Sequence, residues 1–471
     1  MTTALLTDQY ELTMVRAALR SGTALRRSVF ELFGRRLPEG RRYGVVAGTG
    51  RFLDALQDFR FDDRDLDFLV SHEIADDTLA EWLAGYRFTG SVWGYPEGEV
   101  YFPGSPLLIV EGSFAEAVVL ETIALSIYNY DCAVASAASR MALMAGSRPC
   151  IEMGARRANE WAAVAAARAA YIAGFSATSD LEAGARYGIP TTGTAAHSFT
   201  LLHDSEEEAF AAQLATLGEQ TTLLVDTYDV EQAVRTGVRL TDGRLGAIRL
   251  DSGDLAELAA TARALLDSLG AINTKIIVTS DLDEYQIAAL RGAPVDGYGV
   301  GTSLVTGSGA PTCSFVYKLV ARAAGDTDDA PLVPVAKHSV GKASVGGRKY
   351  ALRRLDAHGR ATAEVIGIGT LPTVKGGRPP YPPRDPLSTP AEATDTTWIA
   401  EMDGEARPLL VQLVDHGEIV GREPLTAARE RHQQSLAELP LEARKMSRGD
   451  PAIETVLLDA EGQPLANPYQ T

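Results

Sequence analysis

The chain has 471 residues, of which 45% are hydrophobic and 23% charged, and its formal net charge is −18. This length predicts about two or three domains, and the composition is that of a globular protein, neither disordered nor fibrous. The acidic balance argues against a nucleic-acid surface, which would need clustered Lys and Arg. Any site for anionic substrates must therefore gather its cations locally.

The N-terminus and the cysteines bear on the compartment. The first residues, MTTALLTDQYELTM, contain no basic segment followed by an apolar core, so we expect no secretory signal. The sequence contains no stretch of about 20 uninterrupted apolar residues, the length that a membrane-spanning helix needs. Cys132, Cys150 and Cys313 are far apart and lack CxxC or histidine spacing, which argues against a disulfide framework or a zinc site. We expect a cytoplasmic protein with buried thiols and no membrane partner.

The first part of the chain predicts an antiparallel sheet. Residues 24–112 contain β-like pieces such as RRSVFELFGR and SPLLIVEG, separated by Gly and Pro. In LLTDQYELTM, which precedes them, Asp8 and Tyr10 begin a helix that Asp8 could cap.

The middle of the chain, residues 150–320, repeats a β-prone run, then small or polar residues, then in most cases a helix. The strand candidates are CIEMG, YIAGFSA, IPTTGT, TLLVDTY, AIRLDS, KIIVTSD and GYGVGTS. The clearest helix is 254–270, with Leu and Ala at helical spacing and a closing Gly. Alternating strands and helices predict a parallel sheet, and about seven strands favour an irregular (β/α) barrel over an open sheet.

The last part returns to strands and turns at 331–425, with a Pro-rich loop, LPTVKGGRPPYPPRDP, and a helix at LTAARERHQQSLAEL. We therefore predict an α/β fold in which a sheet-rich α+β domain, built from the N- and C-terminal segments, flanks the barrel. The expected parts are a sheet-rich domain over 1–120, a catalytic barrel over 121–325 and a strand-rich segment over 326–471. This last segment would pack on the other two.

Several predicted strands end in reactive, charged or small residues. These are Arg156, Ser179, His197, Asp226, Asp251, Ser280, Asp281 and Thr302. The C-terminal ends of barrel strands converge on one face, where barrel enzymes carry their active sites. We expect these residues to share a site although they are remote in sequence.

The stretch AIRLDSGDL places Arg249, Asp251 and Asp254 around Ser252 and Gly253 at a strand-to-helix turn. Such a turn can present backbone N–H groups and a helix N-terminus to an anion, while the carboxylates bind ribose hydroxyls or a metal. A capped turn with a surface salt bridge is the alternative.

Two further motifs could bind anions. DGYGVGTSLV carries alternating glycines, among them Gly299 and Gly301, before Thr302, which fits a loop around a terminal phosphate. It has neither the lysine of a P-loop nor GxGxxG spacing. EMGARRANEW sets Arg156 and Arg157 after a strand end, where guanidinium groups could bind carboxylate or phosphate. We expect Arg157 to face solvent.

His197 follows the small residues Gly193 to Ala196 and looks accessible. Its residue type leaves four roles open: a structural histidine, a general base, a metal ligand and a covalent nucleophile. The metal role is disfavoured because His203 is too distant in sequence and no HxH or HExxH spacing occurs.

Together these stretches resemble the nicotinate phosphoribosyltransferases, a type II phosphoribosyltransferase family. The motifs TDQYELTM, EMGARRA, GTAAHSF, LLVDTYD, RLDSGDL, VGTSLVT and VYKLV carry the likeness from residue 7 to 320, and SVGKASVGGRK and LAELPLEAR extend it. The resemblance implies a ligase-type, ATP-coupled transfer of the phosphoribosyl group from phosphoribosyl pyrophosphate to nicotinate, for NAD salvage. The alternatives are transfer to nicotinamide or quinolinate, and a non-catalytic nucleotide-binding relative.

The resemblance also implies residue roles. His197 would carry a transient phosphohistidine and form the catalytic set with Arg249 and Asp251. The residues for nicotinate would be Tyr10, Arg156, Ser179, Thr194 and Arg249. The residues for phosphoribosyl pyrophosphate would be Asp8, Arg156, Asp251, Ser252, Gly253, Gly299, Gly301 and Thr302. Magnesium would be bound in part by Asp251, and ATP is the co-substrate.

The chemistry accounts for these residue types. The ring nitrogen of nicotinate is a nucleophile without a proton, so no general base is needed. The barrier lies in expelling pyrophosphate as the ribose carbon becomes cationic, which calls for positioning and charge stabilisation. The small residues before His197 leave room for a triphosphate beside a neutral imidazole.

Two expectations concern specificity and assembly. The related nicotinamide enzyme has an Asp where this chain has Ser179, and a carboxylate there would repel nicotinate, so Ser179 favours the acid. If this segment were aligned with the nicotinamide enzyme one residue further along, Asp180 would occupy that position instead of Ser179. The segment matching Tyr10 reaches a neighbouring subunit's site in related enzymes, so we predict a homodimer with shared active sites.

Overall fold

The computed structural model describes residues 2–325, 327, 329–337, 344–371 and 405–469. The chain divides into two compact units, Met1–Ala133 with Thr312–Thr471, and Val134–Pro311. These bounds differ from the expected barrel limits of 121 and 325. Helix α6 (Glu121–Ala145) runs across the first boundary, and strand β12 (Val316–Ala323) pairs with the first unit's sheet. Most of the expected Pro-rich loop lies outside the described residues.

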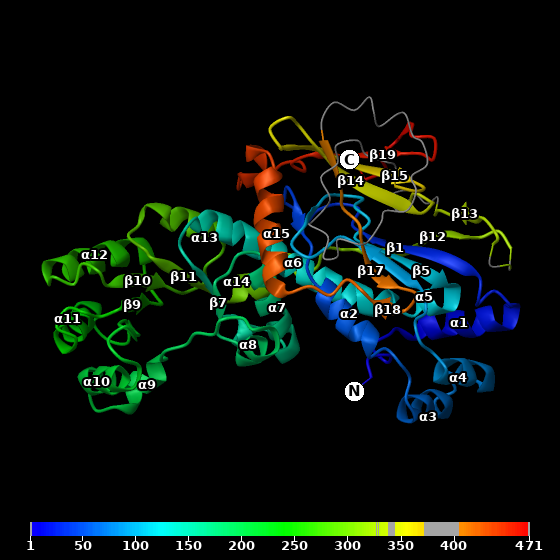
Figure 1. Ribbon diagram of the computed structural model, residues 1–471. Coiled ribbons are helices and arrows are strands. Elements are labelled where there is room, and N and C mark those ends of the chain that lie inside the picture. The colour runs from blue at the N-terminus through cyan, green and yellow to red at the C-terminus, as the bar shows by residue number, and fades with distance from the viewer. Residues whose placement is uncertain (1, 326, 328, 338–343, 372–404, 470–471) are drawn as a thin grey trace. The chain divides into compact units, whose positions relative to one another are not determined.

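The first unit is built on a seven-stranded antiparallel sheet in the order β13-β12-β1-β5-β3-β17-β18 (Figure 1). Its other strands are β1 (Arg27–Phe33), β3 (Ser91–Gly94), β5 (Leu108–Ser113), β13 (Leu332–Pro334), β17 (Val411–Asp415) and β18 (Glu418–Ile419). The N-terminal strands β1, β5 and β3 therefore lie together in the middle of the sheet, and strands from the C-terminal part of the chain flank them on both sides. This confirms the prediction of a sheet-rich domain built from the N- and C-terminal segments.

A five-stranded sheet in the order β16-β14-β15-β19-β20 and a small pair, β2 with β4, complete the strands of this unit. Their bounds are β2 (Gly44–Val45), β4 (Val100–Tyr101), β14 (Lys349–Leu355), β15 (Ala361–Ile368), β16 (Glu405–Pro408), β19 (Glu454–Leu458) and β20 (Pro464–Leu465). Buried ion pairs join distant segments, among them Lys349 with Glu31 and Arg407 with Glu99. Such pairs satisfy charges that would otherwise be costly to bury.

The helices of the first unit cover its sheets and include its long core helix. They are α1 (Gln9–Ser21), α2 (Thr49–Gln57), α3 (Asp63–Ser71), α4 (Asp77–Ala84), α5 (Phe114–Val118), the start of α6, and α15 (Leu425–Glu438). The stretch Phe114–Ala145 is long and apolar enough to cross a membrane, but 67% of its most apolar window is buried inside the protein. That burial is typical of a core helix.

The second unit contains a six-stranded parallel sheet in the order β7-β6-β11-β10-β9-β8. Its strands are β6 (Cys150–Glu152), β7 (Ala177–Thr178), β8 (Thr222–Leu224), β9 (Ala247–Leu250), β10 (Lys275–Val278) and β11 (Gly297–Val300). The first strand, β6, pairs with the last, β11, which is the neighbour relation that closes a barrel. The sheet is a curled, partly open version of the expected (β/α) barrel.

Helices follow most of these strands, and several of them are capped by polar residues. They are α7 (Glu160–Ile172), α8 (Leu181–Tyr187), α9 (His197–Leu202), α10 (Glu206–Leu217), α11 (Val230–Leu240), α12 (Leu255–Ser268), α13 (Glu284–Ala289) and α14 (Thr302–Val305). The side chains of Asp180, Asp229, Asp254 and Asp283 each accept a backbone N–H at a helix start. The predicted helix at 254–270 is confirmed.

Two strand predictions were wrong in part. Most of YIAGFSA is not a strand, because the alanine-rich helix α7 continues to Ile172 and a turn at Gly174 follows. IPTTGT makes only a single parallel bridge, between Thr191 and Thr178, since Pro190 has no N–H to donate to a neighbouring strand.

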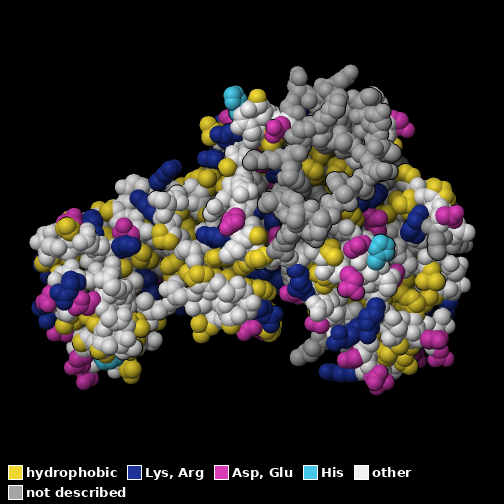
Figure 2. All heavy atoms as spheres, in the orientation of Figure 1, with side chains coloured by type: hydrophobic (Ala, Val, Ile, Leu, Met, Phe, Trp, Pro, Cys, Tyr) yellow, Lys and Arg dark blue, Asp and Glu magenta, His cyan; other side chains and the backbone are white. Residues whose placement is uncertain are grey.

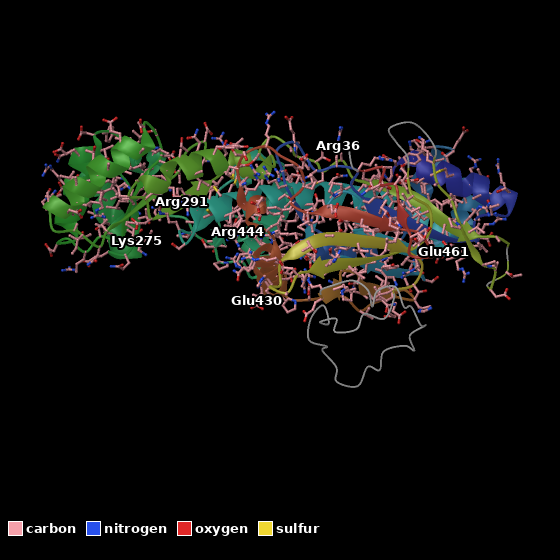
Figure 3. The ribbon with its side chains drawn as sticks, turned by 90° about the horizontal axis from the view of Figure 1, so that it is seen from above. Arg36, Lys275, Arg291, Glu430, Arg444 and Glu461 are labelled. Atoms are coloured by element: carbon pink, nitrogen blue, oxygen red, sulfur yellow. The ribbon has the colours of Figure 1, made fainter. Side chains whose placement is uncertain are left out.

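The surface and the cysteines agree with the composition. Acidic and basic side chains are interspersed on the visible face of each unit (Figure 2). Cys132, Cys150 and Cys313 are buried thiols that form no disulfide with one another, as expected. Lys275 is exposed at the start of β10, at the end of the parallel sheet opposite its C-terminal edge (Figure 3).

Candidate active site

The C-terminal ends of β8, β9 and β10, with the start of α9, bring four polar side chains together. His197 is the first residue of α9, Asp226 follows β8, Asp251 follows β9, and Thr279 follows β10. The hydroxyl of Thr279 donates to Oδ1 of Asp251. The parallel order of the strands thus assembles residues that are remote in sequence.

The imidazole of His197 lies between a hydroxyl and two carboxylates. Its Nδ1 is 3.1 Å from Oγ1 of Thr227, and its Nε2 is 3.9 Å from Oδ1 of Asp226 and 3.9 Å from Oδ2 of Asp251. The ring is 41% exposed. It is therefore reachable from solvent, and its Nε2 faces negative charge without a short hydrogen bond.

Asp226 organises the turn after β9. Its Oδ2 accepts the backbone N–H of Asp251 at 2.9 Å and the hydroxyl of Ser252 at 2.8 Å. The side chain is only 4% exposed, and its Oδ1 is buried without a hydrogen-bond partner. A buried carboxylate oxygen without a partner is costly, so this atom is free to accept a further hydrogen bond.

Arg249, in β9, has a partly buried guanidinium with spare donors. Its Nη2 donates to the carbonyl of Ala195 at 2.9 Å, and its Nε is buried without a partner. Burial lowers the pKa of Arg249, the carboxylates of Asp251 and Asp226 oppose that shift, and the charge of Arg156 adds to it. A partly buried guanidinium with unused donors is suited to binding an anion.

The predicted nicotinate residues at the ends of β6 and β7 are exposed. Arg156 and Arg157 lie together in a 3-10 turn, Ala155–Arg157, and both side chains face solvent. Ser179 follows β7 and is exposed. Asp180 caps α8 by accepting the N–H of Ala183 at 2.8 Å, so its carboxylate has a structural use. Thr194 is exposed in the segment before His197.

The predicted site glycines, in and after β11 and after β9, serve close packing and turn geometry. A Cβ on Gly299 would lie 2.5 Å from Cγ2 of Thr279 and 2.7 Å from Sδ of Met153. Gly301 is the residue before α14, and Thr302 is exposed at the first position of that helix. Gly253 has φ +83, a left-handed conformation that favours glycine in the turn before α12.

Asp8 and Tyr10 belong to the first unit. Asp8 occupies the N-cap position of α1 but makes no capping hydrogen bond with its side chain. Tyr10 is 46% exposed, and partial burial together with Glu121 and Glu11 raises its pKa above the usual range.

Comparisons with known proteins show to which family the chain belongs. Residues 5–129 match the family model described as the nicotinate phosphoribosyltransferase N-terminal domain. The chain is 52% identical, over 97% of its length and 95% of the relative's, to nicotinate phosphoribosyltransferase pncB1 of Mycobacterium tuberculosis. The chain belongs to the nicotinate phosphoribosyltransferase family. The Bacillus subtilis nicotinate phosphoribosyltransferase is 40% identical over 74% of the chain and 72% of that relative.

A solved structure of this nicotinate phosphoribosyltransferase family supports the fold. The human nicotinic acid phosphoribosyltransferase superposes with a TM-score of 0.75, at 27% identity, covering 96% of this chain and 97% of that one. The resemblance inferred from the motifs is therefore confirmed, as is the α/β fold.

The family motifs include residues whose roles sequence reasoning missed. LLVDTYD contains Asp226 and Thr227, the partners of His197, but nothing in its pattern shows which residue of another strand they meet. EMGARRA contains Glu152, a carboxyl buried in β6, which carried no predicted role. Within the described ranges no three His, Cys, Asp or Glu side chains group as a metal site. The magnesium assignment of Asp251 stays a prediction.

Proposed function

We propose that the chain transfers the phosphoribosyl group from phosphoribosyl pyrophosphate to nicotinate, giving nicotinate mononucleotide and pyrophosphate for NAD biosynthesis. The reaction is coupled to ATP through a phosphohistidine at His197. The observation that carries this proposal is the position of His197, with Nδ1 on Thr227 and Nε2 facing Asp226 and Asp251. The names of relatives that are similar along almost the whole chain support the substrate pair.

Nicotinate binding rests on Arg249. Its spare donors bind the substrate's carboxylate, with Arg156 adding positive charge nearby and with Ser179 and Thr194 offering hydroxyls. The pyridine nitrogen attacks the ribose C1, the bond from C1 to pyrophosphate breaks, and the leaving group keeps the electron pair. No proton moves, so the protein acts by positioning and by stabilising charge.

Phosphoribosyl pyrophosphate binds at the turns after β9 and β11. Asp251 takes the ribose hydroxyls, and the backbone N–H groups around Ser252, Gly253 and Thr302 take the phosphates. Asp251 and the unpartnered Oδ1 of Asp226 are the oxygens that would hold magnesium, an ion that prefers such ligands and would neutralise pyrophosphate charge when bound.

His197 couples the reaction to ATP. A neutral ring nitrogen attacks the γ-phosphorus, the bond to the ADP oxygen breaks, and water later hydrolyses the phosphohistidine to inorganic phosphate. The exposed ring and the small, exposed residues Gly193 and Thr194 leave space for a triphosphate. His197 takes no proton from nicotinate in this scheme.

We also propose a cytoplasmic homodimer. Tyr10 is exposed in the first unit and, by the family resemblance, stacks on the nicotinate bound by a neighbouring subunit. Half-exposed aromatic rings are suited to such a contact, because they offer a large apolar area.

The proposal is tested with nicotinate, nicotinamide and quinolinate, each supplied with phosphoribosyl pyrophosphate and magnesium, with and without ATP. We expect mononucleotide from nicotinate and a faster reaction with ATP. Absence of nicotinate mononucleotide under both conditions would refute the proposal, and preference for another pyridine would favour that alternative. Binding of phosphoribosyl pyrophosphate without turnover of any pyridine would favour a non-catalytic relative.

A further inference from the structure

Glu152 is a buried carboxyl that the proposed chemistry does not use. It is the last residue of β6 and is 1% exposed, at the C-terminal edge of the sheet. Its Oε1 accepts the backbone N–H of Gly154, and its Oε2 accepts the hydroxyl of Thr178. Burial raises the pKa of Glu152, while these two donors oppose the rise. A group this costly to bury calls for a function or a structural need.

Thr178, the last residue of β7, extends the network to two more segments. Its Oγ1 also accepts the N–H of Asp180 at 2.9 Å. Its backbone N–H donates to Pro190 at 3.0 Å and its carbonyl accepts from Thr192 at 2.9 Å. The residue is completely buried. Glu152 and Thr178 thus connect the ends of β6 and β7 with the segment that leads to His197.

Each of these three segments carries one predicted nicotinate residue. The loop held through Gly154 continues into Arg156, the turn held through Asp180 contains Ser179, and the segment held through Thr192 continues into Thr194. The backbone N–H of Ser179 also donates to the carbonyl of Glu152, at 2.8 Å.

Close packing keeps the network rigid. A Cβ on Gly154 would lie 2.3 Å from Cγ1 of Val305 and 3.1 Å from the carbonyl of Gly301. The loop bearing Arg156 therefore lies directly against α14 and the residue before it, with no space for another side chain at Gly154. Residues locked by such a second layer of contacts hold binding groups to the small tolerances that catalysis needs.

We propose that the Glu152–Thr178 side-chain pair is a positioning element that fixes the loop of Arg156 and the turn of Ser179 relative to one another, and so sets affinity for the pyridine acid. The backbone of Thr178 holds the segment that leads to Thr194 beside them. Neither residue touches the substrate. The inference rests on the proposed function and adds two residues to it. The pair also decides which residue is presented after β7: it binds the N–H of Asp180, whose carboxylate caps α8, and leaves Ser179 exposed.

The test compares Thr178→Val, which keeps the shape and removes the hydroxyl, with Thr178→Ser, which keeps the hydroxyl. Glu152→Met is a second variant that removes both acceptors. The control is Gln213→Leu, because Gln213 is also buried and donates to Thr221 and Thr222, at the N-terminal end of β8. The measurements are kcat, the KM values for nicotinate and phosphoribosyl pyrophosphate, the nicotinate-to-nicotinamide ratio and the Tm.

We expect Thr178→Val to raise the nicotinate KM about ten- to a hundredfold and to lower the nicotinate-to-nicotinamide ratio. The KM for phosphoribosyl pyrophosphate should change by less than about threefold. Thr178→Ser should resemble the wild type, and Gln213→Leu should lower the Tm without changing either KM. Unchanged nicotinate KM in folded Thr178→Val and Glu152→Met proteins overturns the inference, as does an equal rise in Gln213→Leu. An inactive wild type would instead refute the proposed function on which it rests.

Discussion

Oδ2 of Asp226 accepts the backbone N–H of Asp251 at 2.9 Å, while Oδ1 of the same carboxylate faces Nε2 of His197. One buried side chain therefore fixes the turn that would bind ribose and lies beside the ring that would carry phosphate. The two half-reactions of the proposed cycle share this residue, which gives a physical route for coupling them.

Asp226→Asn should lower kcat/KM with ATP by about ten- to a hundredfold, the usual effect of losing a charged partner behind a reactive group. The amide keeps one acceptor for the turn but removes the negative charge beside His197. Steady-state kinetics with ATP present measure this effect. Asp229→Asn, which changes the N-cap of α11 in the same loop, is the control and should leave the rate near that of the wild type.

Arg249→Lys should raise the nicotinate KM by about tenfold or more, because a single ammonium cannot replace the fork of donors and would lose the bond to Ala195. The KM for phosphoribosyl pyrophosphate is the internal reference. A variant whose nicotinate KM equals that of the wild type would show that another group binds the carboxylate.

Strands and site residues could be predicted from the sequence where a local residue pattern encodes them, but the order of the strands in the sheet could not. β10 is rich in β-branched residues and β11 in glycine, and polar residues follow β9, β10 and β11, so both the strands and the site residues beyond them were predictable. YIAGFSA combines aromatic and β-branched residues, but its first two residues, Tyr171 and Ile172, complete α7, a tertiary effect that local propensity misses. The roles of Asp226 and Glu152 depend on β8 lying beside β9 and β6 lying between β7 and β11. No local pattern encodes those neighbours.

Ser179→Asp should raise the use of nicotinamide relative to nicotinate, because a carboxylate there would repel the acid and accept from the amide. Competition between the two pyridines measures the ratio. Asp180→Asn separates the neighbouring position: it alters a helix cap, so it should cost at most about 1 kcal/mol of stability and leave the ratio unchanged. A shift in that variant instead would assign the selective position to Asp180.

Glu206 should make stability depend on pH. Burial, then the charge of Asp229, raises the pKa of Glu206 to about 7. The folded protein therefore holds a proton that the unfolded chain releases near its ordinary pKa of about 4.3, so this group's contribution to stability falls as pH rises between those values.

Glu206→Gln removes this loss of stability with rising pH, because the amide does not ionise. Its Tm should exceed that of the wild type at pH 8, and the difference should shrink toward pH 4, as thermal melts across this range will show. Glu207→Gln, at an exposed neighbour that pairs with Arg239, is the matched control. A constant difference at all pH values would show that Glu206 does not titrate in this window.

His197 is the central claim, and His197→Ala with labelled ATP tests it most directly. The measurement is the ATP-dependent increase in nicotinate mononucleotide formation, together with acid-labile phosphate on the protein. We predict that the variant keeps some transfer, loses the ATP stimulation and carries no acid-labile phosphate. ATP stimulation that survives in the variant would contradict the account.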